Sequence, residues 1–300
     1  MAAPLRGTQS LVGQMGWVFQ RSSLTAIEVA WRWLFGVPLL LLCWIELQKI
    51  LAAVPPESAG LATLDPQNPW IAAVQLSSAW ALYQPHVAAV LRWLLPLAAL
   101  VWVVFSGLGR SLILKRMDST LRFRPSAMIV LQAAWLAFFA LISWGWLRSL
   151  QWVALTHITP NAEPDLIGFA IWVIFLSLGF FTAWALTSWA LSIAPLVMLL
   201  ENRSALSALG QSLRLGRPMT AKLVEINMVM GIVNLALLVL AMVLSAAPLP
   251  FGDQLGSEAL HAVWATATVF YFIASDYFQV VRLKGFQEFC KMFRGGESAS

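Results

Sequence analysis

Residues 166–200 read LIGFAIWVIFLSLGFFTAWALTSWALSIAPLVMLL, a stretch of 35 residues without a charged side chain. At 1.5 Å per residue, a helix of this length extends about 52 Å, whereas the hydrocarbon core of a bilayer is about 30 Å thick. The stretch therefore predicts a transmembrane helix that is longer than the membrane requires. Because Pro195 removes a backbone hydrogen bond near its end, we expect the spanning part to end there and residues 196–200 to lead into an interfacial helix.

The composition extends this prediction to the whole chain of 300 residues. Apolar residues make up 60% and charged residues 11%, and the mean hydropathy is +0.76, whereas a soluble domain has roughly 25% charged residues. Six apolar stretches are long enough to cross a membrane, at about 31–53, 87–107, 127–149, 167–193, 223–246 and 259–281. We predict an all-α, polytopic transmembrane helical bundle of six spans in residues 31–281. Residues 1–30 are expected to form an interfacial N-terminal segment, and residues 282–300 a basic tail.

The distribution of positive charge predicts the orientation. Almost all of the 19 Lys and Arg residues lie before or at the start of the first stretch, in residues 107–125, in residues 201–222, or after residue 281. Lys49, Arg92 and Arg148 fall on the other side. Because positively charged loops stay in the cytoplasm, we expect a bacterial inner-membrane protein with both termini in the cytoplasm. Orientation accounts for the net charge of +5, and we expect no nucleic acid partner.

The two basic segments on this side suggest an internal repeat. In the first basic linker (residues 107–125), Arg110-Ser111 and Arg124-Pro125 have the same separation as Arg203-Ser204 and Arg217-Pro218 in the second basic linker (residues 201–222), at an offset of 93 residues. The same offset superimposes the neighbouring apolar stretches. We therefore predict an approximate tandem repeat of a helical hairpin, with both copies crossing the membrane in the same direction.

Both basic linkers are typical of amphipathic helices that lie on a membrane surface. In the second, Leu206, Leu209 and Leu213 recur every three or four residues, with polar residues between them. Two functions fit this pattern: the linkers fix the loops to the surface and set the orientation, or they recognise anionic headgroups or a protein partner. Each basic residue near an anionic leaflet contributes about 1 kcal/mol to membrane binding. The candidate residues for such recognition are Arg110, Lys115, Arg116, Arg122, Arg124, Arg203, Arg214 and Arg217.

The second basic linker also carries a resemblance to a known family. The residues are Ala194-Pro195-Leu196-Val197, Glu201 and Ala208-Leu209-Gly210-Gln211-Ser212-Leu213-Arg214-Leu215-Gly216-Arg217. They resemble the pattern Pro-Leu-Val, Glu, Ala-Leu and Ser-Trp-Arg-Leu of the multi-helix membrane-domain family that occurs alone or fused to bacterial glycerophosphoryl diester phosphodiesterases. Leu213 stands where that family usually has Trp. The resemblance implies an integral membrane protein and carries over no catalytic residues.

Polar residues in the last two apolar stretches form a second set of candidates. A charged side chain at the centre of a membrane helix costs about 2.5–3.5 kcal/mol, which makes Asp276 a candidate for function. Asn227 and Asn234 in residues 223–246, and Thr268, Ser275 and Asp276 in residues 259–281, recur at helical spacing. They either line a polar path for a small solute or ion, or join the two helices by hydrogen bonds.

No motif in the sequence points to an enzyme, a metal centre or a cofactor. The patterns GxSxG, HExxH, GxGxxG and the P-loop do not occur, the two cysteines are far apart, and the three histidines have no ligand spacing. We expect no catalytic residue, metal or cofactor. The sequence therefore favours a non-enzymatic lipid-interacting or accessory protein of a larger membrane complex. The alternative is a small-solute or ion transporter or channel.

Overall fold

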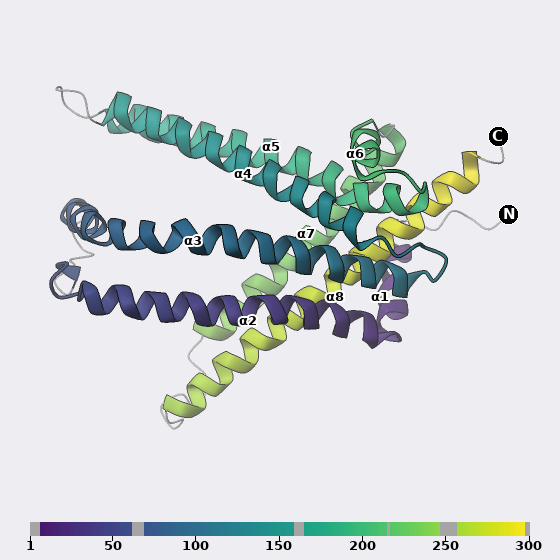
Figure 1. Cartoon of the computed structure of the whole chain (residues 1–300), viewed down its shortest axis with the longest axis horizontal. Coiled ribbons are helices and arrows are strands. Elements are labelled where there is room, and N and C mark those ends of the chain that lie inside the picture. The colour runs from purple at the N-terminus through teal and green to yellow at the C-terminus, as the bar shows by residue number, and fades with distance from the viewer. Residues whose placement is uncertain (1–6, 62–68, 159–164, 215–216, 247–256, 298–300) are drawn as a thin grey trace. The chain divides into compact units, whose positions relative to one another are not determined.

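The computed structural model describes residues 7–61, 69–158, 165–214, 217–246 and 257–297, and these ranges contain no β-strand (Figure 1). This confirms the all-α fold class. Each of the six predicted stretches lies within one long helix. The helices are α1 (Gly7–Phe19), α2 (Ser22–Ala53), α3 (Pro69–Met117), α4 (Pro125–His157), α5 (Leu166–Leu200), α6 (Ala205–Ser212), α7 (Arg217–Ala246) and α8 (Ser257–Glu297).

Five described helical segments are long and apolar enough to cross a membrane: Ser22–Ala53, Val74–Met117, Pro125–His157, Leu166–Ala185 and Val224–Val243. The chain is therefore a multi-pass membrane protein. α8 has 41 residues but does not belong to this set, because polar side chains such as Asp276 and Gln279 lower its hydropathy. The sixth span, at residues 259–281, stays a prediction.

The chain divides into two compact units, one of residues 1–29 and 107–300, the other of residues 30–106. The smaller unit holds most of α2 and α3. Within it, the Tyr83 hydroxyl donates a hydrogen bond of 3.1 Å to the backbone carbonyl of Val54. α3 begins at Pro69, whose fixed φ suits the first position of a helix, and it continues through Pro85 and Pro96. The larger unit contains both basic linkers.

In the larger unit, α4 and α5 form an antiparallel hairpin joined by aromatic contacts (Figure 1). Trp135 and Phe139 of α4 both meet Trp184 of α5 edge to face, with ring centroids 5.1 and 4.9 Å apart. Farther along the hairpin, Trp146 stacks on Phe180 at 5.1 Å. Each such pair contributes about 0.5–1.5 kcal/mol beyond the area that it buries. These aromatic side chains therefore hold the two helices together.

The end of α5 differs from the expectation for Pro195. α5 continues as a helix through Pro195 to Leu200, and residues 191 and 193–199 are buried, so the helix does not end at Pro195. The helix ends because Asn202 adopts a left-handed conformation with φ 52°, and the Arg203 N–H returns to the carbonyl of Met198 at 3.1 Å. Burial of this last segment within the unit outweighs the local cost of Pro195.

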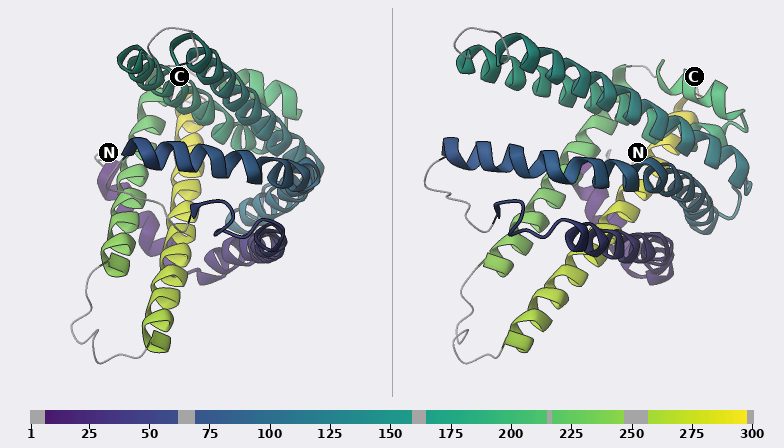
Figure 2. Two further views of the ribbon diagram at one scale, coloured as in Figure 1. Left: turned by 90° about the vertical axis from the view of Figure 1, so that its left-hand side faces the viewer. Right: turned by 60° about the vertical axis from the view of Figure 1, so that its left-hand side comes forward.

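α7 and α8 run antiparallel beside each other, and α1 packs against both (Figure 2). Gly285 of α8 lies where the three helices meet. A Cβ atom at Gly285 of α8 would lie 2.8 Å from Gln14 Oε1 of α1 and 3.8 Å from Ile226 Cγ2 of α7. Small residues at such crossings let helix backbones pack closely in membrane proteins.

Candidate functional site

The two basic linkers differ in structure and are in direct contact. In the first, residues 110–117 are the last turns of α3 and do not form the separate surface helix that we expected. In the second, α6 is a separate helix whose N-cap, Ser204, accepts a hydrogen bond from the Ser207 N–H. Arg124 joins the linkers by donating to Asn202 Oδ1 at 2.5 Å and to the Arg203 carbonyl at 3.3 Å.

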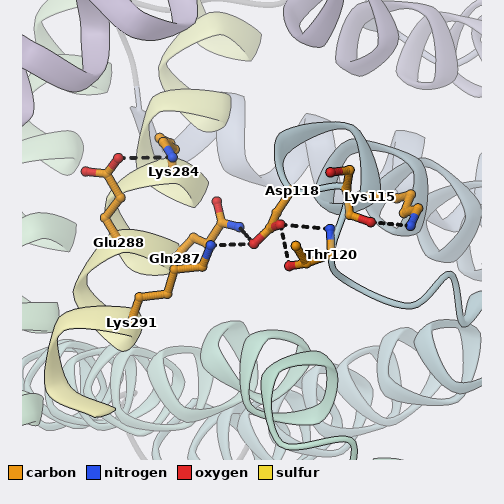
Figure 3. Close-up of polar contacts among 8 residues, drawn as sticks. Lys115, Asp118, Thr120, Lys284, Gln287, Glu288 and Lys291 are labelled. Carbon is orange, nitrogen blue, oxygen red and sulfur yellow. Dashed lines mark hydrogen bonds and ion pairs between the residues drawn. The ribbon is translucent and has the colours of Figure 1, made fainter. Parts of the chain in front are cut away.

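The turn of the first basic linker is stabilised by its own polar side chains (Figure 3). Asp118 Oδ1 accepts from the Thr120 N–H at 3.0 Å and from the Thr120 hydroxyl at 2.6 Å. Lys115 Nζ donates to the carbonyls of Ser119 and Leu121 at 2.6 and 2.8 Å. These bonds satisfy backbone groups of the turn that follows α3.

Asp118 also connects this turn to the C-terminal part of α8 (Figure 3). Asp118 Oδ2 forms a short ion pair with Lys291 and accepts from Gln287 Nε2 at 3.3 Å. Burial by itself raises the pKa of the Asp118 carboxyl, but hydrogen bonds from Lys291 and Thr120 outweigh burial and lower the pKa from 3.8 to about 2. The Asp118 side chain is therefore an anion at physiological pH and anchors α8.

A second polar contact connects α1 to the same part of α8. Gln14 Nε2 donates to Glu288 Oε2 at 3.3 Å, and Lys284 pairs with Glu288 Oε1 at 3.0 Å. Lys284 Nζ also lies 4.2 Å from the ring centroid of Trp17, and the Arg21 guanidinium lies 3.9 Å from it. Cation–π contacts of this kind contribute about 0.5–2 kcal/mol. The N-terminal helix is thus anchored by charged and aromatic side chains.

The candidate basic residues fall into two groups. Lys115 and Arg124 bind linker backbone groups, Arg203 pairs with Glu201 at 2.7 Å, and Arg110 is half-buried with an interaction of its own. The side chains of the second group are exposed and form no hydrogen bond or ion pair with the described part of the chain; this group comprises Arg116, Arg122 and Arg214. The side chain of Arg217 lies outside the described residues. The structure thus leaves three candidate side chains free for an external anion.

Large apolar side chains are exposed on the same linkers as these three arginines. Phe123 of the first linker is 49% exposed, and Leu206 and Leu213 of the second are 74% and 61% exposed. α6 instead buries Ala208 and Ser212 against the rest of the unit. We use the name interfacial face for the exposed side chains of the two linkers taken together, which are Arg116, Arg122, Phe123, Leu206, Leu213 and Arg214. Its combination of cations and apolar groups suits the boundary between headgroups and acyl chains.

The structure brings together only part of the predicted polar path in α7 and α8. Asp276 is 3% exposed, and Asn227, Asn234 and Ser275 are half-buried. Asn234 Oδ1 is buried without a hydrogen-bond partner among the described residues. Thr268 is exposed, and its hydroxyl donates to the carbonyl of Trp264 in its own helix at 2.8 Å. Thr268 therefore does not line a path between the helices.

The antiparallel packing of α7 and α8 sets the level at which these residues meet. Ile226 of α7 lies beside Gly285 of α8. From this pair toward the α7–α8 connection, Asn234 lies about as far along α7 as Asp276 lies along α8. The two residues are therefore at about the same level. Two polar side chains from different helices thus occur at one level, which is the arrangement that either a polar path or an interhelical hydrogen bond requires.

The three histidines lie in unrelated surroundings. His157 Nδ1 lies 3.1 Å from Asp165 Oδ2, His261 meets Trp264 edge to face, and His86 is exposed. Within the described ranges, no three His, Cys, Asp or Glu side chains are placed to hold a metal ion.

Sequence reasoning did not identify the residues that join α1 and the first basic linker to α8. These residues are Gln14, Asp118, Gln287, Glu288 and Lys291. One signal was present: Val280, Leu283, Phe286 and Cys290 continue an apolar stripe at helical spacing beyond residue 281. That stripe would have predicted a packed helix in place of a simple tail. The partner of Asp118, which is 173 residues away, has no sequence signal.

The arrangement provides three exposed arginines on linkers that also expose apolar side chains, and a packed polar junction between helices. No protein-family model, no curated protein and no solved structure matches this chain.

Proposed function

We propose that this chain is a non-enzymatic, lipid-interacting protein of the bacterial cytoplasmic membrane, with both termini in the cytoplasm. Its interfacial face would bind the anionic headgroups of the cytoplasmic leaflet. The observation that carries this proposal is the presence of three unpaired arginines, Arg116, Arg122 and Arg214, on linkers that also expose Phe and Leu. Similarity to the membrane-domain family described above, in the second basic linker, agrees with this role.

The energetics of the face fit reversible lipid recognition. At about 1 kcal/mol for each basic residue near an anionic leaflet, three arginines contribute about 3 kcal/mol, roughly a hundredfold preference over neutral lipid. A guanidinium also matches the geometry of a phosphate with two parallel hydrogen bonds. The exposed Phe123, Leu206 and Leu213 would add apolar contact with the upper acyl chains.

The test is a comparison of the lipids that stay bound after mild extraction. The triple variant Arg116→Gln, Arg122→Gln, Arg214→Gln should lose most of the phosphatidylglycerol or cardiolipin that native mass spectrometry finds on the parent, and should keep its phosphatidylethanolamine. The matched control, Lys49→Gln with Arg92→Gln, removes positive charge from residues on the other side. Unchanged anionic lipid on the triple variant would rule out the interfacial face as the binding surface. Stoichiometric proteins that depart only from the triple variant would favour an accessory role in a complex.

A separate measurement tests the orientation. Cys290 is buried, so its reactivity does not report the side of the membrane. A single cysteine at exposed Ser119, in a chain with Cys43→Ser and Cys290→Ser, should react only after the cells are opened. A cysteine at exposed Gln151 should react in intact cells. The reverse result would invert the proposed topology.

Transport of a small solute or ion is the second candidate, and the level shared by Asn234 and Asp276 favours it. The probe is proton flux into proteoliposomes that contain a pH-sensitive dye. Asp276→Asn should abolish flux that the parent supports. Equal flux in the parent and the variant would remove Asp276 from any transport mechanism.

A further inference from the structure

A second candidate site lies on α4, near the end opposite the basic linkers. Trp144, Leu147, Arg148 and Gln151 line an open hollow of about 460 Å³. Their spacing of three and four residues places them on one face of the helix. Trp144 and Leu147 are 63% and 57% exposed, and Arg148 and Gln151 are also exposed. The hollow is therefore an open depression on the exposed face of α4.

The position along α4 gives the depth of this hollow in a membrane. α4 begins at Pro125, beside the first basic linker. At 1.5 Å per residue, Arg148 lies about 35 Å farther along the helix, just beyond a hydrocarbon core of about 30 Å. Arg148 is thus expected at the level of the phosphates of the opposite leaflet. Trp144 falls within about 6 Å of that level, where indole rings are favoured.

The charge of Arg148 is not compensated. Its Nη1 donates to Gln151 Oε1 at 2.7 Å, and no carboxylate of the described residues pairs with it. Gln151 is neutral, so this bond orients the guanidinium without cancelling its charge. Lys49, another basic residue predicted on this side, pairs with Glu46 at 2.6 Å. Unlike Lys49, Arg148 has no carboxylate partner among the described residues, so it is available to bind an anion from outside the chain.

We infer that this hollow binds the phosphate of a glycerophospholipid in the leaflet opposite the basic linkers. Arg148 would donate to the phosphate oxygens, since a guanidinium has five N–H donors and one bond to Gln151 leaves the others available. Trp144 would lie beside the glycerol region, and Leu147 against the first acyl carbons. The site uses none of the residues of the interfacial face, so the test of this inference does not depend on the proposal made for that face.

The experiment is photo-crosslinking of the full-length protein in nanodiscs. The probe is phosphatidylethanolamine with a diazirine on an acyl carbon close to the glycerol. Peptide mapping should find crosslinks in residues 144–151 of the parent. Arg148→Gln should reduce them about tenfold, as expected for the loss of a charge-assisted hydrogen bond. Arg148→Lys should reduce them less, because a lysine keeps the charge but not the fork of donors.

The triple variant of the interfacial face is the matched control, and its crosslinks at residues 144–151 should equal those of the parent. Equal crosslinking in Arg148→Gln and the parent would overturn the inference. Displacement of the lipid by millimolar inorganic phosphate would also overturn it, because the site would then prefer a free anion. Matching thermal unfolding of parent and variants, followed by tryptophan fluorescence, is required before the crosslinks are compared.

Discussion

Replacing Asp118 by Asn tests whether the contact between the first basic linker and α8 holds the end of α8 in place. Asn keeps an oxygen that can accept from Thr120, but it removes the negative charge that faces Lys291. Lys291 and the buried Gln287 would then be held less firmly. We expect the C-terminal part of α8 to detach more often from the junction.

The expected magnitude follows from the pKa of Asp118. A shift from 3.8 to about 2 corresponds to about 2.5 kcal/mol in favour of the ionised form in the folded protein. Lys291 is 48% exposed, so water screens part of this interaction. Asp118→Asn should therefore destabilise the junction by about 1–2 kcal/mol. Asp118→Ala should cost about 1 kcal/mol more, because Gln287, which is 1% exposed, loses its acceptor.

Cys290 provides the assay, because it is 3% exposed and directly precedes Lys291. With Cys43 replaced by Ser, Cys290 is the remaining thiol of the two in the sequence. Asp118→Asn should raise its labelling rate roughly 5–30-fold, the ratio that corresponds to 1–2 kcal/mol. Glu57→Gln, which removes an exposed carboxylate from the other unit, is the control. Equal rates for Asp118→Asn and this control would refute the reasoning.

The pH dependence of this effect has a defined sign. Because the pKa of Asp118 is lower in the folded chain than its ordinary value of 3.8, its contribution is complete above about pH 4 and is lost as the pH falls toward about 2. The difference in thermal midpoint between the parent and Asp118→Asn should shrink when the pH is lowered from neutral to about 3. A constant difference would assign the effect to packing and not to charge.

Two further predictions concern the packing of α3 against α4 and the start of α5. Gly107→Ala places a Cβ 2.9 Å from Ile129 Cα and N, and because backbone cannot move aside, we expect a loss of about 1–3 kcal/mol in the free energy of unfolding. Gly145→Ala, where the space is open, should unfold like the parent, and equal midpoints for both alanine variants would contradict the close contact. Asp165→Ala should lower the thermal midpoint, because it removes the carboxylate that accepts from the Gly168 N–H at 2.9 Å. That hydrogen bond is the main cause of the lowered pKa of Asp165, so the difference from the parent should disappear in acid, and its persistence there would argue against the cap.

The sequence was sufficient to predict the long helices, because the bilayer imposes a strong and local requirement. An unpaired backbone group in hydrocarbon costs several kcal/mol, so an apolar stretch of sufficient length must be a helix. The stretch at residues 166–200 needed no further information. The sixth span, at residues 259–281, was harder to predict. Asp276 and its polar neighbours lower the hydropathy of this stretch, whereas the stretch that forms α5 has no charged side chain.

The sequence was insufficient where packing overrides a local preference. Pro195 favours the end of a helix, but the buried segment around it stays helical and Asn202 ends α5 a few residues later. The repeat similarly predicted two surface helices, whereas the first linker continues α3. For the candidate site, residue type and charge predicted a basic surface. They did not distinguish Arg124, which stabilises the linkers, from Arg122, which stays free, because that difference depends on a contact with Asn202.

The anchoring of α8 by α1 and the first linker has a consequence for biosynthesis. Gln14 and its partner Glu288 are 274 residues apart, and ribosomes add about 5–20 residues per second. The N-terminal helix therefore waits roughly 14–55 seconds for its partner, while the intervening helices enter the membrane. Completion of this junction requires synthesis through residue 291. A chain that stops short of Gln287 would leave Asp118 without Gln287 and Lys291, and would leave Gln14 without Glu288.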